Sequence, residues 1–221
     1  MIITDRRFSE FTSALHEGMP HLEHMFVDFD GVIIDSEPIQ ARCYSTVLLR
    51  YGVNFTADEF AGLMGNSESK IWSVLIDRYN LSRNADELTD ERRDLLIKSL
   101  TSNDVRSNWY MKPLLKFAVD NDVVPQIVSA NQTIVIEAVL KHVELADAFG
   151  VIHSLQEIRP SISKSVLLAQ LVGDSSSSSL IIEDSASTLR AAKQQGLFCV
   201  AVRHSLNDHS QVRGDIVLNA F

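Results

Sequence analysis

Residues 25–38 read Met-Phe-Val-Asp-Phe-Asp-Gly-Val-Ile-Ile-Asp-Ser-Glu-Pro. The first three residues are apolar and β-compatible, so they are typical of the end of a short buried strand. Two carboxylates, Asp28 and Asp30, follow at alternate positions, and Gly31 then permits a sharp turn. Because α/β sheets bind ligands in the crevice beyond their strand ends, we expect both carboxylates to face a ligand site.

Two carboxylates that converge on one point repel each other, and one of them takes up a proton if nothing balances the charge. A divalent cation removes this conflict, and Mg²⁺ prefers carboxylate oxygens, water and phosphate as ligands. The segment with Asp28 and Asp30 therefore predicts a magnesium site.

The chain has 221 residues, a formal net charge of −9 and 45% hydrophobic residues. This length fits one domain with an insertion or two small domains, and the apolar content is enough for a sizeable core. The negative charge disfavours binding to nucleic acid or to an anionic membrane. A small anionic substrate would need a local cation.

Other features of the chain favour a cytoplasmic protein. Cys43 and Cys199 lie far apart in apolar surroundings, and we expect them to be buried reduced thiols. No apolar run approaches the ~18 residues that a membrane span needs. Residues 1–20 lack the apolar centre of a signal peptide. A monomer and a homodimer both remain compatible with the sequence.

After Pro38 the pattern changes from a strand to helices. Thr56, followed three residues later by Glu59, is the signature of a capping box at a helix start. The helices that we expect in this part cover residues 39–51, 56–64, 67–79, 86–100 and 104–109. We therefore interpret residues 40–110 as an inserted all-helical cap domain.

From residue 112 onward, strands and helices alternate. We expect strands at residues 123–128, 150–153, 180–182, 198–202 and 216–218, separated by helices. This alternation predicts an α/β fold with a doubly wound parallel sheet, a Rossmann-like core with right-handed crossovers. The core would comprise residues 1–39 and 111–221, with residues 1–22 as an N-terminal extension that contains a short helix at 7–16.

The order of these motifs resembles the haloacid dehalogenase superfamily, in the branch of phosphatases and β-phosphoglucomutase-like enzymes with a helical cap. The resemblance covers about residues 25–205. It rests on residues 28–38, a strand ending at Ser129, a basic residue near 159–164, and the segment Ile182-Glu183-Asp184-Ser185 followed by Ala191, Ala192 and Gly196.

The resemblance implies a role for each catalytic residue. Asp28 would attack phosphorus and form an aspartyl-phosphate, which splits one hard displacement into two easier ones. Asp30 would protonate the leaving alkoxide and then deprotonate the water that hydrolyses the intermediate. Ser129 would donate a hydrogen bond to a phosphoryl oxygen. Gly31, Ala130 and Asn131 would also contact the substrate.

The resemblance also implies the magnesium ligands. Asp28, the backbone carbonyl of Asp30, and Asp184 would hold Mg²⁺, with Glu183 as a further ligand or a water-mediated partner. The family also uses a cation to balance the nucleophile and the phosphate. Arg159 and Lys164 are both candidates for this role, and the sequence leaves the choice open.

Several positions depart from the pattern of this branch. Gln40 stands where a histidine is frequent, and Glu68 stands where the mutase resemblance would want arginine; its negative charge would repel a second phosphate. Glu37 and Lys70 would either reach the substrate or form a salt bridge between cap and core. Six histidines show no metal-binding spacing, and we expect them on the surface or in loops: His21, His24, His142, His153, His204 and His209.

The leading interpretation is an Mg²⁺-dependent phosphomonoesterase that acts on a small phosphorylated metabolite such as a sugar phosphate. A phosphosugar mutase and a phosphonatase of the same fold are alternatives. Gln40 and Glu68 argue against the mutase, and the phosphonatase needs a Schiff-base lysine, for which Lys70 is the nearest candidate. A catalytically weak binding or regulatory protein is an alternative of another class, against which the intact acidic set argues.

Overall fold

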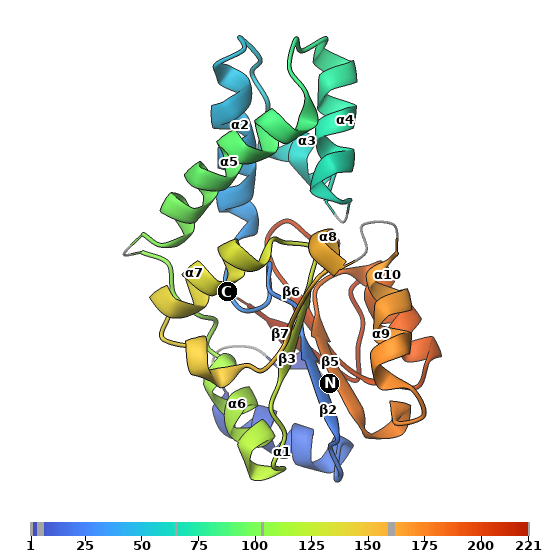
Figure 1. Ribbon diagram of the computed structural model, residues 1–221. Helices are drawn as coiled ribbons and strands as arrows, with labels where there is room; N and C mark the ends of the chain where they lie inside the picture. The colour runs from blue at the N-terminus through green and yellow to red at the C-terminus, as the bar shows by residue number, and fades with distance from the viewer. Residues whose placement is uncertain (1, 4–6, 65, 103, 159–161, 221) are drawn as a thin grey trace.

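The computed structural model describes residues 2–3, 7–64, 66–102, 104–158 and 162–220. Its centre is a seven-stranded sheet in the order β1-β7-β6-β5-β2-β3-β4, in which all neighbouring strands are parallel (Figure 1). The strands are β1 (Ile2–Ile3), β2 (His24–Val27), β3 (Gln126–Ser129), β4 (Ile152–Ser154), β5 (Ser179–Glu183), β6 (Phe198–Arg203) and β7 (Ile216–Asn219). The expected doubly wound α/β fold is confirmed.

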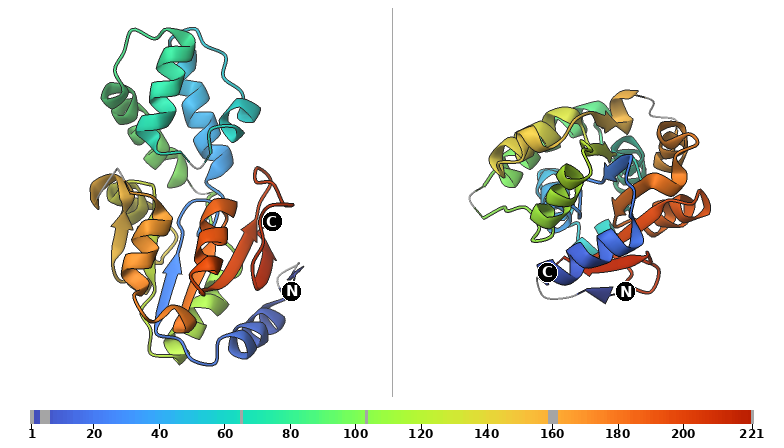
Figure 2. Two further views of the ribbon diagram at one scale, coloured as in Figure 1. Left: turned by 90° about the vertical axis from the view of Figure 1, so that its right-hand side faces the viewer. Right: turned by 90° about the horizontal axis from the view of Figure 1, so that it is seen from below.

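Helices cover both faces of the sheet (Figure 2). Met25 and Val27 of β2 belong to one apolar cluster, whereas Phe26 between them belongs to another, as the alternation of side chains along a strand requires. The first cluster includes residues of α1 (Phe8–Gly18), α6 (Met111–Asp120) and α7 (Thr133–His142), and the second includes residues of α9 (Lys164–Val172) and α10 (Ala186–Gln194). Burial on both faces explains why the central strands read as continuous apolar runs.

Four further helices lie between β2 and α6 and form a separate layer, drawn above the sheet in Figure 1. We call them the helical insertion: α2 (Glu37–Leu49), α3 (Ala57–Ala61), α4 (Glu68–Tyr79) and α5 (Ala85–Leu100). They enclose an apolar cluster of their own around Tyr44 and Trp72. The capping box at Thr56 and Glu59 is present at the start of α3. The domain limits at residues 40 and 110 stay a prediction.

The two connections between the insertion and the sheet contact each other. Ile34 and Ser107 form an isolated β-bridge. The Val32 carbonyl accepts hydrogen bonds from Asn108 Nδ2 at 2.7 Å and from Tyr110 Oη at 2.6 Å. The helix expected at residues 104–109 is therefore wrong for the described residues, because this segment pairs with the first connection and α6 follows it.

Smaller elements complete the fold. α8 (Leu155–Ile158) follows β4, and two short 3₁₀ turns span Ala146–Ala148 and Ser176–Ser178. β1 pairs with β7 and adds an edge strand that no sequence pattern predicted. In the ranges that the structure describes, no helix combines the length and the apolar character needed to cross a membrane.

Candidate active site

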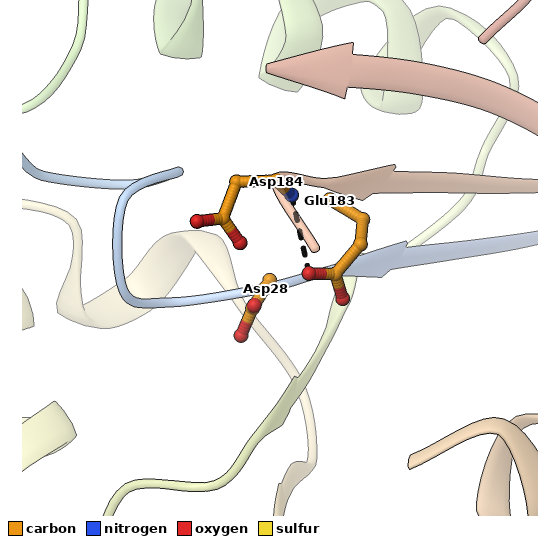
Figure 3. A group of neighbouring side chains, drawn as sticks. All are labelled: Asp28, Glu183 and Asp184. Carbon is orange, nitrogen blue, oxygen red and sulfur yellow. Dashed lines mark hydrogen bonds between the residues drawn. The ribbon is translucent and has the colours of Figure 1, made fainter. Parts of the chain in front are cut away.

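Three carboxylates meet where two neighbouring strands end (Figure 3). β2 pairs with β5 as far as Val27 and Ile182, and the Asp28 N–H continues this ladder with a 2.9 Å hydrogen bond to the Ile182 carbonyl. Asp28 therefore lies beside Glu183, the last residue of β5, and beside Asp184. One carboxylate oxygen of each residue lies within 4.8 Å of those of the other two, and all three residues are buried.

The turn after Asp28 passes close to Asp184. Gly31 has a φ of +69°, a backbone conformation that favours glycine. A Cβ at this position would lie 2.8 Å from Asp184 Oδ2, so any side chain would displace that carboxylate. Gly31 is thus needed for the packing of the acidic group, and its expected contact with the substrate stays a prediction.

Lys164, the first residue of α9, brings a positive charge into the acidic group. Its Nζ lies 2.6 Å from Asp28 Oδ2 and 2.9 Å from Glu183 Oε2. Burial disfavours the charged ammonium, but Asp28 and Glu183 outweigh this effect and raise the pKa of Lys164. Of the two cations considered from the sequence, Lys164 contacts Asp28; Arg159 lies outside the described residues.

The acidic group holds more negative charge than Lys164 can balance. Burial, followed by the neighbouring Glu183, raises the pKa of Asp28 to about 7, although Lys164 opposes the shift. Burial also raises the pKa of Glu183. Three ionised carboxylates against one ammonium favour a divalent cation, and a buried oxygen-only donor set is what Mg²⁺ prefers. Asp28, Glu183 and Asp184 could therefore hold this ion.

Asp30 lies at the edge of this group and is held by three donors. Its Oδ1 accepts hydrogen bonds from Ser36 Oγ at 2.7 Å and from Gln40 Nε2 at 2.8 Å, and its Oδ2 accepts one from Asn131 Nδ2 at 3.1 Å. Burial, followed by the charge of Asp28, raises the pKa of Asp30 to about 6. A carboxyl group with this pKa exchanges protons readily near neutral pH.

Glu68 does not present an unpaired negative charge, contrary to the expectation from the sequence. Arg92 of α5 donates to Glu68 Oε1 at 2.7 Å, and both side chains are at least nine-tenths buried. Arg92 also donates to the Gln40 side-chain oxygen, and its guanidinium lies 4.1 Å from the centre of the Tyr44 ring. A chain of contacts thus runs from Glu68 through Arg92 and Gln40 to Asp30.

Sequence reasoning missed Arg92, although α5 contains a signal for it. Leu88, Arg92, Leu96 and Leu100 are all buried and recur at intervals of four residues. This spacing places the arginine on the apolar stripe of the helix. Arg92 lies in a run of consecutive charged residues with Glu91 and Arg93, and a run of this kind is typical of a solvated helix face. The run therefore made the four-residue spacing hard to recognise.

His204 lies in a loop, as one of the two expectations for the histidines had it, but the residue is buried and its contact with the acidic group was not foreseen. It directly follows β6, and its Nε2 lies 2.8 Å from Asp184 Oδ2. The only signal in the sequence was its position two residues after the strand expected at 198–202, at the sheet edge that carries the acidic group. Spacing between histidines could not reveal it, because its partner is a carboxylate.

Of the other site residues predicted from the sequence, Ser129 and Glu37 are buried, whereas Lys70 is exposed. Ser129 is buried at the end of β3, where its Oγ accepts a 3.0 Å hydrogen bond from the Asn131 N–H. Glu37 is buried, and burial followed by the charge of Asp30 raises its pKa well above the ordinary value. Lys70 is exposed on α4 and is not among the described residues that line the cavity.

A cavity of ≈ 820 Å³ connects these groups with the helical insertion. The sheet edge contributes Asp28, Asp30, Ser129, Ala130, Asn131 and Asp184. The insertion contributes the Glu68–Arg92 pair. It also contributes four largely apolar side chains, Tyr44, Phe60, Met64 and Ile71. A small ligand in this cavity would therefore contact both layers of the molecule.

The fold and this acidic site place the chain in a known class of enzymes. A family model described as haloacid dehalogenase-like hydrolase matches residues 25–202. The chain belongs to this family, as the resemblance of its motifs implied.

Particular relatives are similar to the chain over most of its length. The fructose-1-phosphate phosphatase YqaB of Escherichia coli is 24% identical and covers 81% of this chain and 95% of that protein. The phosphorylated carbohydrates phosphatase of Thermotoga maritima is 24% identical, and the match covers 85% of this chain and 88% of that protein. These names agree with the expectation of a phosphatase.

Solved structures support the same fold. CbbY of Rhodobacter sphaeroides, in complex with phosphate, superposes with a TM-score of 0.77 at 16% identity and covers 90% of this chain and 94% of that chain. The shared arrangement thus extends over both the sheet and the helical insertion.

Proposed function

We propose that the protein is an Mg²⁺-dependent phosphomonoesterase that acts through an aspartyl-phosphate on a small phosphorylated metabolite. The observation that carries this proposal is the buried group of Asp28, Glu183 and Asp184, with Lys164 against two of its carboxylates. The group lies at the carboxyl edge of a parallel sheet, where α/β proteins bind ligands. Family membership and the names of the relatives support the proposal.

In this mechanism, Asp28 attacks the phosphorus atom and becomes the carrier of the phosphoryl group. Lys164 favours the ionised form of Asp28, because its ammonium lies 2.6 Å from the carboxylate. Mg²⁺, held by Asp28, Asp184 and the Asp30 backbone carbonyl with Glu183 beside them, would neutralise the developing charge on the phosphoryl oxygens. Ser129, with the Ala130 and Asn131 backbone, would orient those oxygens.

Asp30 supplies the proton for the leaving alkoxide and later removes a proton from the attacking water. A pKa of about 6 leaves roughly a tenth of this carboxyl group protonated at pH 7 and makes both proton transfers accessible. Its three hydrogen-bond donors, Ser36, Gln40 and Asn131, fix its orientation before the reaction. The contact with Gln40 connects this proton transfer to the helical insertion.

The helical insertion would act as a cap that covers the substrate and excludes water from the first step. Its apolar side chains line the cavity opposite the acidic group. Acidic side chains outnumber basic ones among the described residues that line the cavity, and Arg92 is already paired with Glu68. These features favour a monophosphate on an uncharged, hydroxyl-bearing skeleton, such as a sugar, over a bisphosphate. They support hydrolysis over mutase chemistry, which needs a second phosphate site.

A turnover assay tests this proposal directly. The purified chain is incubated with a panel of phosphorylated sugars and other monophosphates, and inorganic phosphate is measured with Mg²⁺ and with excess chelator. We expect phosphate release that depends on Mg²⁺ and needs no bisphosphate activator. Full turnover in excess chelator would contradict the metal requirement. Isomerised sugar phosphate without phosphate release would identify a mutase instead.

A further inference from the structure

His204 occupies a position at the acidic group that the mechanism above does not use. Its side chain is fully buried, and its Nε2 lies 2.8 Å from Asp184 Oδ2. The same carboxylate oxygen is the atom that a side chain on Gly31 would displace. Asp184 is therefore enclosed between the turn after β2 and the segment after β6.

The second nitrogen of the ring determines which atom carries the proton. Nδ1 of His204 accepts a 3.2 Å hydrogen bond from the Leu206 N–H, so this nitrogen keeps its lone pair. The ring proton then lies on Nε2 and points to Asp184. The Nε2–H in this arrangement donates to the Asp184 carboxylate and orients it.

The loop after β6 is built to hold this ring in place. Asn207 accepts a hydrogen bond from the His204 N–H at 3.2 Å, and it donates to the Asp184 carbonyl at 3.3 Å and to the Val202 carbonyl at 3.0 Å. His209 Nε2 lies 2.8 Å from the His204 carbonyl. Two residues of one loop thus contact Asp184, one at its carboxylate and one at its backbone.

We propose that His204 is a positioning residue for Asp184, and that its Nε2–H holds the carboxylate in the orientation that binds the divalent cation. This inference rests on the proposed metal-dependent function. Hydrogen-bond partners of metal ligands restrict the orientation of those ligands, and their loss typically weakens metal binding by roughly 10–100-fold. His204 would act through Asp184 alone and would not contact the substrate.

Direct metal-binding measurements on the full chain test this role. Mg²⁺ affinity is measured by calorimetry and Mn²⁺ affinity by electron paramagnetic resonance, for the wild type, His204→Leu and His204→Gln. Leucine removes the donor, and we expect a roughly 10–100-fold weaker Kd for both ions. Glutamine places an amide N–H near the former Nε2 position, and we expect its Kd to stay within about threefold of wild type, well below the loss expected for leucine.

His209→Leu is the matched control, because it removes a ring contact in the same loop and leaves the contact with Asp184 intact. Equal metal affinity in His204→Leu and the wild type would overturn the inference. Equal weakening in His204→Leu and His209→Leu would also overturn it, because loop order and not the donor would then control binding. A wild type that binds neither ion would contradict the metal site itself.

A measurement on the wild type covers the case in which His204→Leu does not fold. The imidazole N–H resonances are recorded by ¹H–¹⁵N NMR, and the signal of His204 is assigned by its loss in His204→Gln. We expect a proton on Nε2 whose resonance shifts when Mg²⁺ is added. A proton on Nδ1, or a resonance that Mg²⁺ leaves unchanged, would overturn the inference.

Discussion

The sheet edge and the helical insertion both present charged side chains to the same cavity, but they hold them in different ways. At the sheet edge, the charges belong to residues at strand ends, and the backbone ladder between β2 and β5 sets their separation. In the insertion, Arg92 and Glu68 come from two different helices and meet only through their side chains. The sheet edge therefore fixes the positions of its charged side chains through backbone hydrogen bonds. The insertion fixes the positions of its charged side chains only through side-chain contacts, which single substitutions can change.

This difference assigns different tasks to the two regions. Reacting groups must keep their separation throughout the reaction, and a hydrogen-bonded sheet provides that rigidity. Substrate selection can change through a few side-chain substitutions, and helices that meet through side chains permit them. The predictions below test whether changes at the sheet edge affect chemistry, and whether changes in the insertion affect selectivity.

The largest effect is expected from Asp28→Asn. The substitution keeps the shape of the side chain but removes the nucleophile, and loss of a nucleophile costs on the order of 10³-fold or more in kcat. Phosphate release under saturating Mg²⁺ measures the loss, and circular dichroism checks that the fold persists. Activity within tenfold of wild type would exclude Asp28 as the nucleophile.

A smaller but still large effect is expected from Lys164→Met. Removal of this cation leaves Asp28 and Glu183 without their ammonium partner, and loss of one electrostatic stabiliser costs roughly 10²–10³-fold in kcat. Arg159→Met is the matched comparison for the cation question and should cost less than about tenfold, since the stabiliser that contacts Asp28 remains. If the two losses were reversed, Arg159 would be the balancing cation.

In the insertion, Glu68→Gln should change selectivity more than chemistry. The substitution releases Arg92 from its ion pair, so that its guanidinium can bind a second anionic group of the substrate. We expect the ratio of kcat/KM for a sugar bisphosphate to that for the corresponding monophosphate to rise about tenfold, which corresponds to about 1.4 kcal/mol. Glu87→Gln, which breaks an exposed pair between α5 and Arg83 in the loop before it, should leave the ratio unchanged. An equal response in both variants would remove the distinction between the two regions.

The smallest effect concerns stability and pH at the sheet edge. In the folded chain the pKa of Asp28 is raised to about 7, so the folded state binds more protons than the unfolded state between about pH 4 and pH 7. Stability without metal should therefore fall as pH rises through this window. Asparagine does not ionise, so Asp28→Asn should gain Tm over the wild type as pH rises, by about 2–4 °C for each kcal/mol. A Tm difference between the two proteins that stays constant from pH 4.5 to pH 8 would show that the ionisation of Asp28 does not destabilise the folded chain.

The parts of the molecule that could be predicted from sequence are those set by local periodicity. Strand ends carrying Asp28, Ser129 and Glu183 are visible as apolar runs that stop at a polar residue, and parallel pairing brings such ends to one edge. The choice between Lys164 and Arg159 was not visible in this way. It depends on which side chain reaches Asp28 in space, which no periodic pattern encodes.

The missed residues share a physical cause. Arg92 and His204 are buried polar groups whose charged partners, Glu68 and Asp184 respectively, are distant in the sequence. Lys70 shows the converse case, because Glu68 and Ile71 line the cavity while the lysine between them is exposed on another side of α4. A shift of one or two residues along a helix rotates a side chain by 100° or more, so motif position alone does not determine which residue reaches the substrate.

The strand order also has a consequence for biosynthesis. Val27, in the middle of the sheet, pairs with Ile127 on one side and Ile182 on the other, so both neighbours of β2 are made long after it. A nascent chain that has completed the helical insertion already carries Asp28 and Asp30 but lacks both strands that pair with β2. Such distant pairings fold late and slowly. The ribosome therefore releases the segment with Asp28 and Asp30 first, and the proposed site is complete only when the residues around Asp184 have emerged.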